Sequence, residues 1–99
     1  MRNVEFKKND NGKAPLHHLG DFNIGLEAMC RVSEYGAQKY GRRNWELCKD
    51  KTRYEAALMR HALKALSGEM VDPDHGQSHW AAVAWNAMCL MHLEGGVDA

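Results

Sequence analysis

The chain has 99 residues, of which 44% are hydrophobic and 26% are charged, which is typical of a folded domain and excludes a disordered chain. Thirteen basic residues balance thirteen acidic ones, so no overall field favours duplex nucleic acid, and a phosphate ligand must be bound locally. Three cysteines outside any C-x-x-C pair argue against a disulfide framework and a zinc knuckle, and no run reaches the ~20 apolar residues of a membrane span. We therefore expect one cytoplasmic domain over residues 1–99 with no membrane partner.

The first part of the chain is expected to be an extended arm over residues 1–20. Residues 7–15 are rich in charge and turn formers and show no hydrophobic period. From Ile24 the apolar residues follow helical spacing, and Gly36 and Gly41 bracket the end of the pattern. A first helix is predicted over residues 23–39.

A second helix is predicted from Thr52 to about Ser67. Thr52 and Glu55 have the S/T-x-x-E spacing of a capping box, and Gly68 suits the left-handed residue that ends helices. Pro73 and Gly76 predict a loop after it.

A third helix is predicted over residues 79–93, capped by Ser78 or Asp74 and ended by two glycines at 95 and 96. Its helical stripe of core residues is expected to be Trp80, Val83, Ala84 and Ala87. These elements predict an all-α fold, a small antiparallel bundle of three main helices with an extended N-terminal arm. Completion by a homo-oligomer is expected, because the large apolar residues exceed what one short bundle can bury, namely Trp80, Trp85, Met88 and Met91.

Three cations line one face of the second helix. Arg53, Arg60 and Lys64 recur at helical spacing and are candidates for binding phosphate, although a solvated basic stripe has the same pattern.

Two carboxylates, Glu69 and Asp72, follow the second helix directly. Carboxylate oxygens are ligands for hard divalent cations, so the two residues are candidate metal ligands, while acidic loops without function are also common.

Two histidines are candidates for catalysis. His79 opens the third helix, and the short loop that joins antiparallel neighbours should place it near the loop carboxylates. His61 lies further back on the second helix and is a candidate for substrate contact or a structural residue. Asn86 shares a face with His79 and is either a core hydrogen-bonding residue or a ligand contact, while His75 is expected to be an exposed loop residue.

The segment from residue 35 to residue 45 alternates glycines, cations, an amide and aromatics. Such residues can approach and complement a nucleotide, or can simply be solvated. The candidate substrate-binding residues here are Lys39, Arg43, Asn44 and Trp45.

Taken together, these segments resemble the phage dATP/dGTP diphosphohydrolase domain, which is akin to the all-α nucleotide pyrophosphohydrolases. The resemblance covers most of the chain and rests on the order and spacing of its motifs: residues 11–15, 35–41 and 43–45, Arg53-Tyr54, Arg60-His61, Gly68-Glu69, Asp72-Pro73, Gly76, His79 and Asn86.

This resemblance implies that a purine deoxynucleoside triphosphate, dGTP or dATP, is hydrolysed to the monophosphate and pyrophosphate with a divalent metal (Mg, Mn or Co), in the cytoplasm of an infected host cell. The chain departs from the wider superfamily because Glu69-x-x-Asp72 has the form of the E-x-x-D pair but no E-x-x-E pair precedes it. Either His61 and His79 have taken over ligand or base roles, or the domain binds nucleotide without efficient hydrolysis. A nucleotide kinase without a P-loop and a non-enzymatic binding module remain alternatives.

Overall fold

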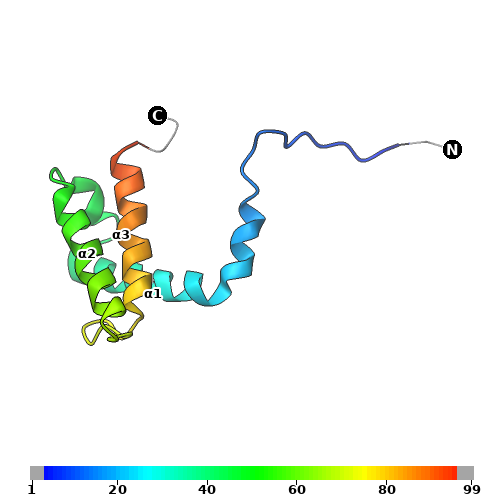
Figure 1. Ribbon diagram of the computed structural model, residues 1–99. Coiled ribbons are helices and arrows are strands. Elements are labelled where there is room, and N and C mark those ends of the chain that lie inside the picture. Colours follow the sequence, from blue (N-terminus) through cyan, green and yellow to red (C-terminus); the bar gives the residue numbers. More distant parts are fainter. Residues whose placement is uncertain (1–3, 96–99) are drawn as a thin grey trace.

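The computed structural model describes residues 4–95 and is built from helices (Figure 1). Three α-helices follow one another as α1 (Asn23–Tyr40), α2 (Thr52–Leu66) and α3 (His79–Leu93). Two 3-10 segments, η1 (Leu16–Phe22) and η2 (Asn44–Leu47), precede α1 and α2. Within residues 4–95 the only β-type pairing is a single bridge between Val71 and Ser78. The predicted all-α class is confirmed.

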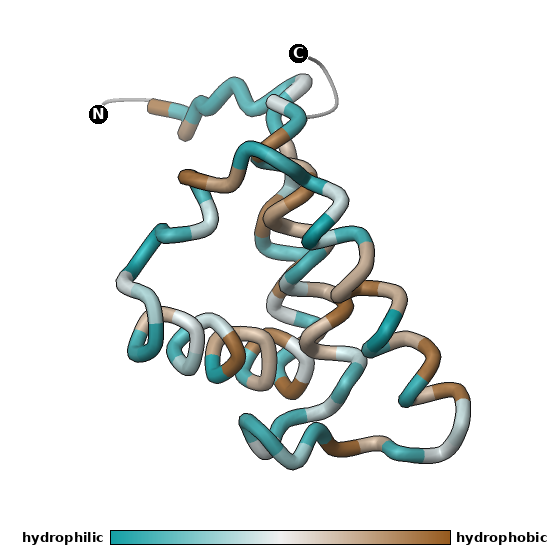
Figure 2. Tube along the Cα trace, turned by 90° about the vertical axis from the view of Figure 1, so that its left-hand side faces the viewer, coloured by the Kyte–Doolittle hydropathy of each residue, from teal (hydrophilic) through white to brown (hydrophobic). Residues whose placement is uncertain are grey.

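Helix α3 is the centre of the fold. It packs along α2, and α1 crosses the pair and contacts α3 with part of its length (Figures 1 and 2). A salt bridge of 3.0 Å between Lys51 and Glu94 joins the start of α2 to the end of α3, as expected for antiparallel neighbours. The buried apolar core consists mainly of small side chains, which let the helices approach closely: Val32, Ala65, Ala81, Ala82 and Cys89.

The cap of α2 differs from the predicted capping box. Thr52 does not bond to Glu55; its hydroxyl and its backbone N–H both donate to the carboxylate of Asp50, at 2.6 and 3.1 Å. The side-chain hydrogen bond from Thr52 is the largest cause of the lowered pKa of Asp50. The Asp50 carboxylate therefore accepts the Thr52 N–H that Glu55 would have accepted in a capping box. At α3 the prediction is confirmed, since the Ser78 hydroxyl oxygen accepts the backbone N–H of Trp80.

The predicted core stripe of α3 is wrong in part. Trp80 is 45% exposed and Ala84 is also exposed, whereas Ala81 and Ala82 are buried. Since nearly every position of α3 is apolar, hydrophobic spacing alone could not tell which face would meet α1 and α2.

The N-terminal arm is shorter than predicted. Residues 4–15 contain no regular helix or strand, but Leu16–Phe22 form η1, which leads directly into α1. The arm points away from the α2–α3 pair (Figure 1). No helix of residues 4–95 has the length and apolar character needed to cross a membrane.

Candidate metal centre and adjoining cavity

The loop between α2 and α3 folds back on itself. Gly68, with φ +105°, ends α2, and the chain then forms two backbone hydrogen bonds across the loop. The N–H of Asp72 donates to the carbonyl of Gln77 at 2.9 Å, and the N–H of His79 donates to the carbonyl of Met70 at 2.9 Å. The side chain of Asp72 is thereby brought to the first turn of α3.

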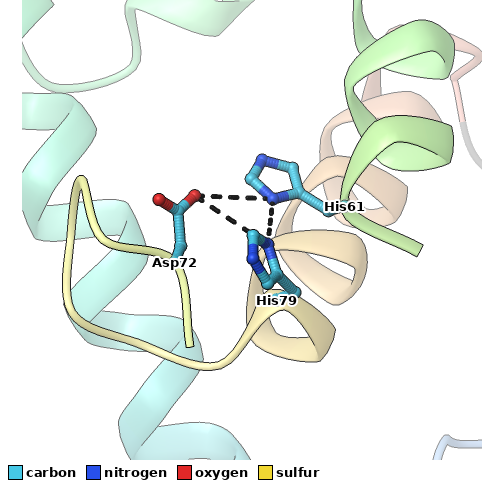
Figure 3. A group of neighbouring side chains, drawn as sticks. All are labelled: His61, Asp72 and His79. Carbon is cyan, nitrogen blue, oxygen red and sulfur yellow. Dashed lines mark hydrogen bonds and ion pairs between the residues drawn. The ribbon is translucent and has the colours of Figure 1, made fainter. Parts of the chain in front are cut away.

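Three side chains from three elements converge at this point: His61 from α2, Asp72 from the loop and His79 from α3 (Figure 3). The Nδ1 atoms of the two histidines lie 2.9 Å apart. Asp72 Oδ2 lies 3.6 Å from Nδ1 of His61 and 4.0 Å from Nδ1 of His79. Asp72 and His79 are buried, and His61 is half-buried. The structure therefore brings together both predicted catalytic histidines and one of the two predicted metal ligands.

Glu69 takes a different place. Its Oε2 lies 2.7 Å from Nε2 of His79, on the side of the ring away from His61. A carboxylate accepts hydrogen bonds, so this contact places the proton of a neutral His79 ring on Nε2 and leaves a lone pair on Nδ1. A histidine whose far nitrogen donates to a carboxylate is the usual arrangement of a metal-binding histidine.

The environment of His61 favours its neutral form. Burial is the largest cause of the lowered pKa of this ring, and the carboxylate of Asp72 opposes the shift. Because only a neutral imidazole offers a lone pair, a lowered pKa keeps His61 available to bind a metal near neutral pH.

His75 lies beside Asp72 and is not the exposed residue that the sequence predicted. Its side chain is 6% exposed, and its Nε2 lies 3.3 Å from Oδ2 of Asp72. The backbone N–H of Gln77 donates to Nδ1, so the proton of the neutral ring lies on Nε2. Nε2 is buried and has no hydrogen-bond partner in the part of the chain that the structure describes, because its contact with Asp72 is at ion-pair distance without hydrogen-bond geometry. His75 therefore lies beside the carboxylate with an unsatisfied buried donor.

The three converging atoms suit a single divalent cation. Two ligand atoms that share one Zn-sized ion at about 2.1 Å lie about 3.0 to 3.4 Å apart at right or tetrahedral angles. Two of the three observed separations, 2.9 and 3.6 Å, are close to this range, and the third is 4.0 Å. Two imidazole nitrogens and one carboxylate oxygen form a donor set used by Zn²⁺, Mn²⁺ and Co²⁺.

A cavity of about 720 Å³ lies along α2, between η2 and α3. Its volume lies within the range of ligand sites in proteins. Ala57 and Asn86 line it, one turn before His61 on α2 and two turns after His79 on α3. The cavity and the three converging side chains therefore belong to one continuous stretch of the α2–α3 pair. Its polar and aromatic lining includes Tyr40, Asn44, Lys49, Asp50, Arg53, Tyr54 and Arg60.

The predicted substrate-binding residues separate into three groups. Four of them, Asn44, Arg53, Arg60 and Asn86, line this cavity. Arg43 and Trp45 line a smaller adjoining cavity of about 130 Å³, together with Asn44. Lys39 and Lys64 line neither: the ammonium of Lys39 lies 5.0 and 5.2 Å from the ring centroids of Tyr35 and Tyr40.

Asn86 and Trp45 are held in place by neighbouring groups. Asn86 is buried, and its amide nitrogen donates to the carbonyl of Ala82 at 2.7 Å, which orients the amide beside the cavity. The Trp45 ring packs on His92 with centroids 5.4 Å apart, which fixes η2 against α3. Arg43, with a left-handed φ of 63°, forms an ion pair with Glu46.

Sequence reasoning missed several residues of this region. His75 stands alone in a loop of the sequence, and only the fold of that loop shows its contact with Asp72. Tyr54, Lys49 and Asp50 line the large cavity because η2 turns the chain back toward α2. Tyr54 directly follows Arg53 in one of the family-like motifs, and Asn44 belongs to another. Its place among these motifs was the available signal that Tyr54 belongs to the site.

The fold and the site together define a small all-α domain with a histidine–carboxylate cluster that could hold a metal ion, next to a cavity with two arginines. A family model described as dATP/dGTP diphosphohydrolase, N-terminal, matches residues 4–97. The chain belongs to this family.

A curated relative supports the assignment at a greater distance. A protein of Salmonella phage PMBT28, named dATP/dGTP diphosphohydrolase, is 37% identical over 93 residues. The match covers 94% of this chain and 30% of the relative, so the chain spans less than a third of the length of that protein. No solved structure matches the chain.

Proposed function

We propose that the domain hydrolyses a purine deoxynucleoside triphosphate, dGTP or dATP, to the monophosphate and pyrophosphate. The single observation that carries the proposal is the convergence of His61, Asp72 and His79 next to a cavity large enough for a ligand, in a member of this family. The relative's name supplies the substrate class and the type of reaction.

A divalent metal, Mn or Co rather than Mg because two of the three donors are imidazole nitrogens, would be held by Nδ1 of His61, Nδ1 of His79 and a carboxylate oxygen of Asp72. Such an ion supplies Lewis-acid stabilisation of the charge on a triphosphate. Glu69 then orients and polarises His79 through Nε2, and His75 lies beside Asp72 at ion-pair distance. This proposal revises the sequence expectation, in which Glu69 was a direct ligand, His79 a ligand or base, and His61 a substrate contact.

The cavity residues would bind the substrate. Arg53 and Arg60 both line the cavity from α2 and would offset the charge of the phosphates, with the triphosphate between them and the metal donors. Asn86 and Asn44 offer oriented amides to the sugar or base, and the ring of Tyr54 offers an aromatic surface. In the reaction, a water oxygen bonds to the α-phosphorus, the bond to the bridging oxygen of the β-phosphate breaks, and a proton leaves to solvent.

Product analysis tests the proposal. The purified chain is incubated with dGTP or dATP and Mg²⁺, Mn²⁺ or Co²⁺, and the phosphorus-containing products are separated and identified. Monophosphate and pyrophosphate in equal amounts would support the proposal. A diphosphate formed only with an acceptor nucleotide would favour a kinase, and the absence of turnover with every metal would favour a binding module.

A further inference from the structure

The smaller cavity, of about 130 Å³, lies between α1 and the α2–α3 pair, and we call it the slot. On the α1 side its lining consists of Ser33, Gly36, Ala37 and Tyr40. These residues recur at i, i+3, i+4 and i+7 and therefore share one face of the helix. Because three of the four have small side chains or none, this face of α1 leaves room between itself and the neighbouring helices.

The opposite wall of the slot is aromatic. Tyr54 of α2 and Trp85 of α3 line it, with their ring centroids 6.0 Å apart and their planes tilted by 57°. Both side chains are half-buried, and Trp45 of η2 adds a third ring to the lining. Such rings offer faces and edges on which a flat aromatic ligand can pack.

Gly36 is not explained by the fold. It lies inside α1 with a helical backbone, and glycine destabilises such a position relative to alanine. A Cβ built on Gly36 would meet no packing neighbour within 4 Å, so close contact between helices does not require glycine either. Gly25 of the same helix has open space too, but it lines neither cavity. At Gly36 the lack of a side chain keeps the slot open.

The volume of the slot suits part of a nucleotide. Sites for whole ligands of drug size usually measure about 300–1,000 Å³, and a cavity of about 150 Å³ is enough to hold benzene. The slot, at about 130 Å³, joins the cavity of about 720 Å³, because Tyr40, Asn44 and Tyr54 line both. A flat ring in the slot could therefore remain attached to a sugar and phosphates in the large cavity.

We propose that the slot binds the purine ring of the nucleotide, between Gly36 on one side and the Tyr54–Trp85 pair on the other. The inference rests on the proposed function, which supplies the nucleotide, and it adds the orientation of the substrate. Tyr54 lies two turns before His61, about 10 Å along α2. With the base at Tyr54, the phosphates extend past Arg60 toward the candidate metal centre.

The chemistry of the slot favours purines as a class. Stacking on aromatic rings tolerates different bases, since every base has a π-face, and the two fused rings of a purine offer more surface than the single ring of a pyrimidine. Adenine and guanine also share the N7 acceptor, for which Asn44 supplies an amide donor where the two cavities meet. The slot is therefore expected to accept both purines and to bind pyrimidines more weakly.

A displacement experiment tests this selectivity without any variant. The probe is the deoxyribonucleoside monophosphate of 2-aminopurine, whose fluorescence is quenched when its ring stacks on an aromatic side chain. The wild-type chain, without metal, is expected to quench the probe. The purine monophosphates dAMP and dGMP should displace it at concentrations at least about tenfold lower than dCMP and dTMP do. Equal displacement by all four nucleotides, or no quenching, would overturn the proposal.

Gly36→Leu fills the slot and tests its location. Gly25→Leu, at an open position of the same helix outside both cavities, is the matched control. Because leucine is the better helix former, both variants should unfold at temperatures no lower than that of the wild-type chain. Only Gly36→Leu should weaken binding of the probe, by at least about tenfold. A folded Gly36→Leu variant that binds the probe as the wild type does would overturn the proposal.

Two outcomes separate this inference from the proposed function. If the wild-type chain hydrolyses dGTP and Gly36→Leu leaves the KM unchanged, hydrolysis stands and the slot is not the base site. If the wild-type chain hydrolyses no nucleotide but binds the probe with purine selectivity, and Gly36→Leu abolishes this binding, the slot is the base site of a binding module and the proposed function is wrong.

Discussion

Nδ1 of His61 on α2 lies 2.9 Å from Nδ1 of His79, the first residue of α3. Because Glu69 accepts the proton of His79 Nε2, the two Nδ1 atoms can share only one proton, from His61. A divalent cation that replaced this proton would find lone pairs on both rings and the Asp72 carboxylate beside them. Metal binding should therefore move the proton of the neutral His61 ring from Nδ1 to Nε2 with almost no net proton release near neutral pH, which calorimetry in buffers of different ionisation enthalpy can check.

Asp72→Asn is expected to abolish metal-dependent turnover and to weaken Mn²⁺ binding by more than about 100-fold, because it removes the charged oxygen donor. Asn retains an oxygen for the N–H of Asp74, which now donates to Oδ1 of Asp72 at 2.7 Å. The free energy of unfolding should therefore change by no more than about 1 kcal/mol. Asp74→Asn removes the neighbouring exposed charge and serves as the control. Unchanged Mn²⁺ affinity in Asp72→Asn would exclude Asp72 as a ligand.

Glu69→Gln is expected to have a smaller effect than Asp72→Asn. Gln keeps an oxygen that accepts the N–H of His79. It lacks the negative charge that makes Nδ1 of this ring a stronger metal ligand, so metal affinity should fall by about 10-fold. Titration calorimetry with Mn²⁺ compares the two variants. If Glu69→Gln weakens binding as much as Asp72→Asn does, Glu69 is itself a ligand and the cluster has been assigned incorrectly.

Arg60→Ala is expected to raise the KM for dGTP or to lower kcat by at least about tenfold, equivalent to ~1.4 kcal/mol, because Arg60 lines the cavity one residue before His61. Steady-state kinetics measure the change. Arg31→Ala removes a cation that is already paired with Glu27 on the exposed side of α1 and is the matched control. Wild-type kinetics in Arg60→Ala would mean that the basic stripe of α2 is only solvated.

The thiol of Cys89 is expected to be unreactive in the native protein. Burial raises its pKa to about 11, whereas Cys30 is exposed on α1. Since the thiolate is the reactive form, an aromatic disulfide reagent at about pH 8 should modify Cys30 much faster than Cys89. Peptide mapping after short exposure identifies the modified thiols, and urea should remove the difference. Equal rates in the folded protein would show that Cys89 is not buried.

The same shift predicts a loss of stability at high pH. The unfolded thiol ionises near pH 9 and the folded one near pH 11, so the unfolded state loses its proton first. The contribution of Cys89 is fully present below about pH 9 and is lost as the pH rises toward 11. Urea unfolding of wild type and Cys89→Ala across this interval should show a steeper decline for the wild type. Parallel declines would contradict the assigned cause.

The three helices could be predicted because their signals are local. Gly41, Gly68 and Ser78 end or begin helices through their own backbone or side chain, and the structure confirms these boundaries. The meeting of Asp72 with His79 followed from the short loop between antiparallel helices. The buried face of α3 could not be predicted, because all of its faces are apolar. The positions of His75 and Glu69 could not be predicted either. That of His75 depends on the hydrogen bonds of the loop, and that of Glu69 on the direction in which His79 points.

A crystal structure with Mn²⁺, analysed by anomalous scattering, tests the central claim most directly. The account predicts one anomalous peak within about 2.4 Å of Nδ1 of His61, Nδ1 of His79 and a carboxylate oxygen of Asp72. Glu69 should remain on Nε2 of His79, outside the coordination sphere. A peak bound by Glu69 without His61, or a cluster that stays free of metal at saturating Mn²⁺, would contradict the account.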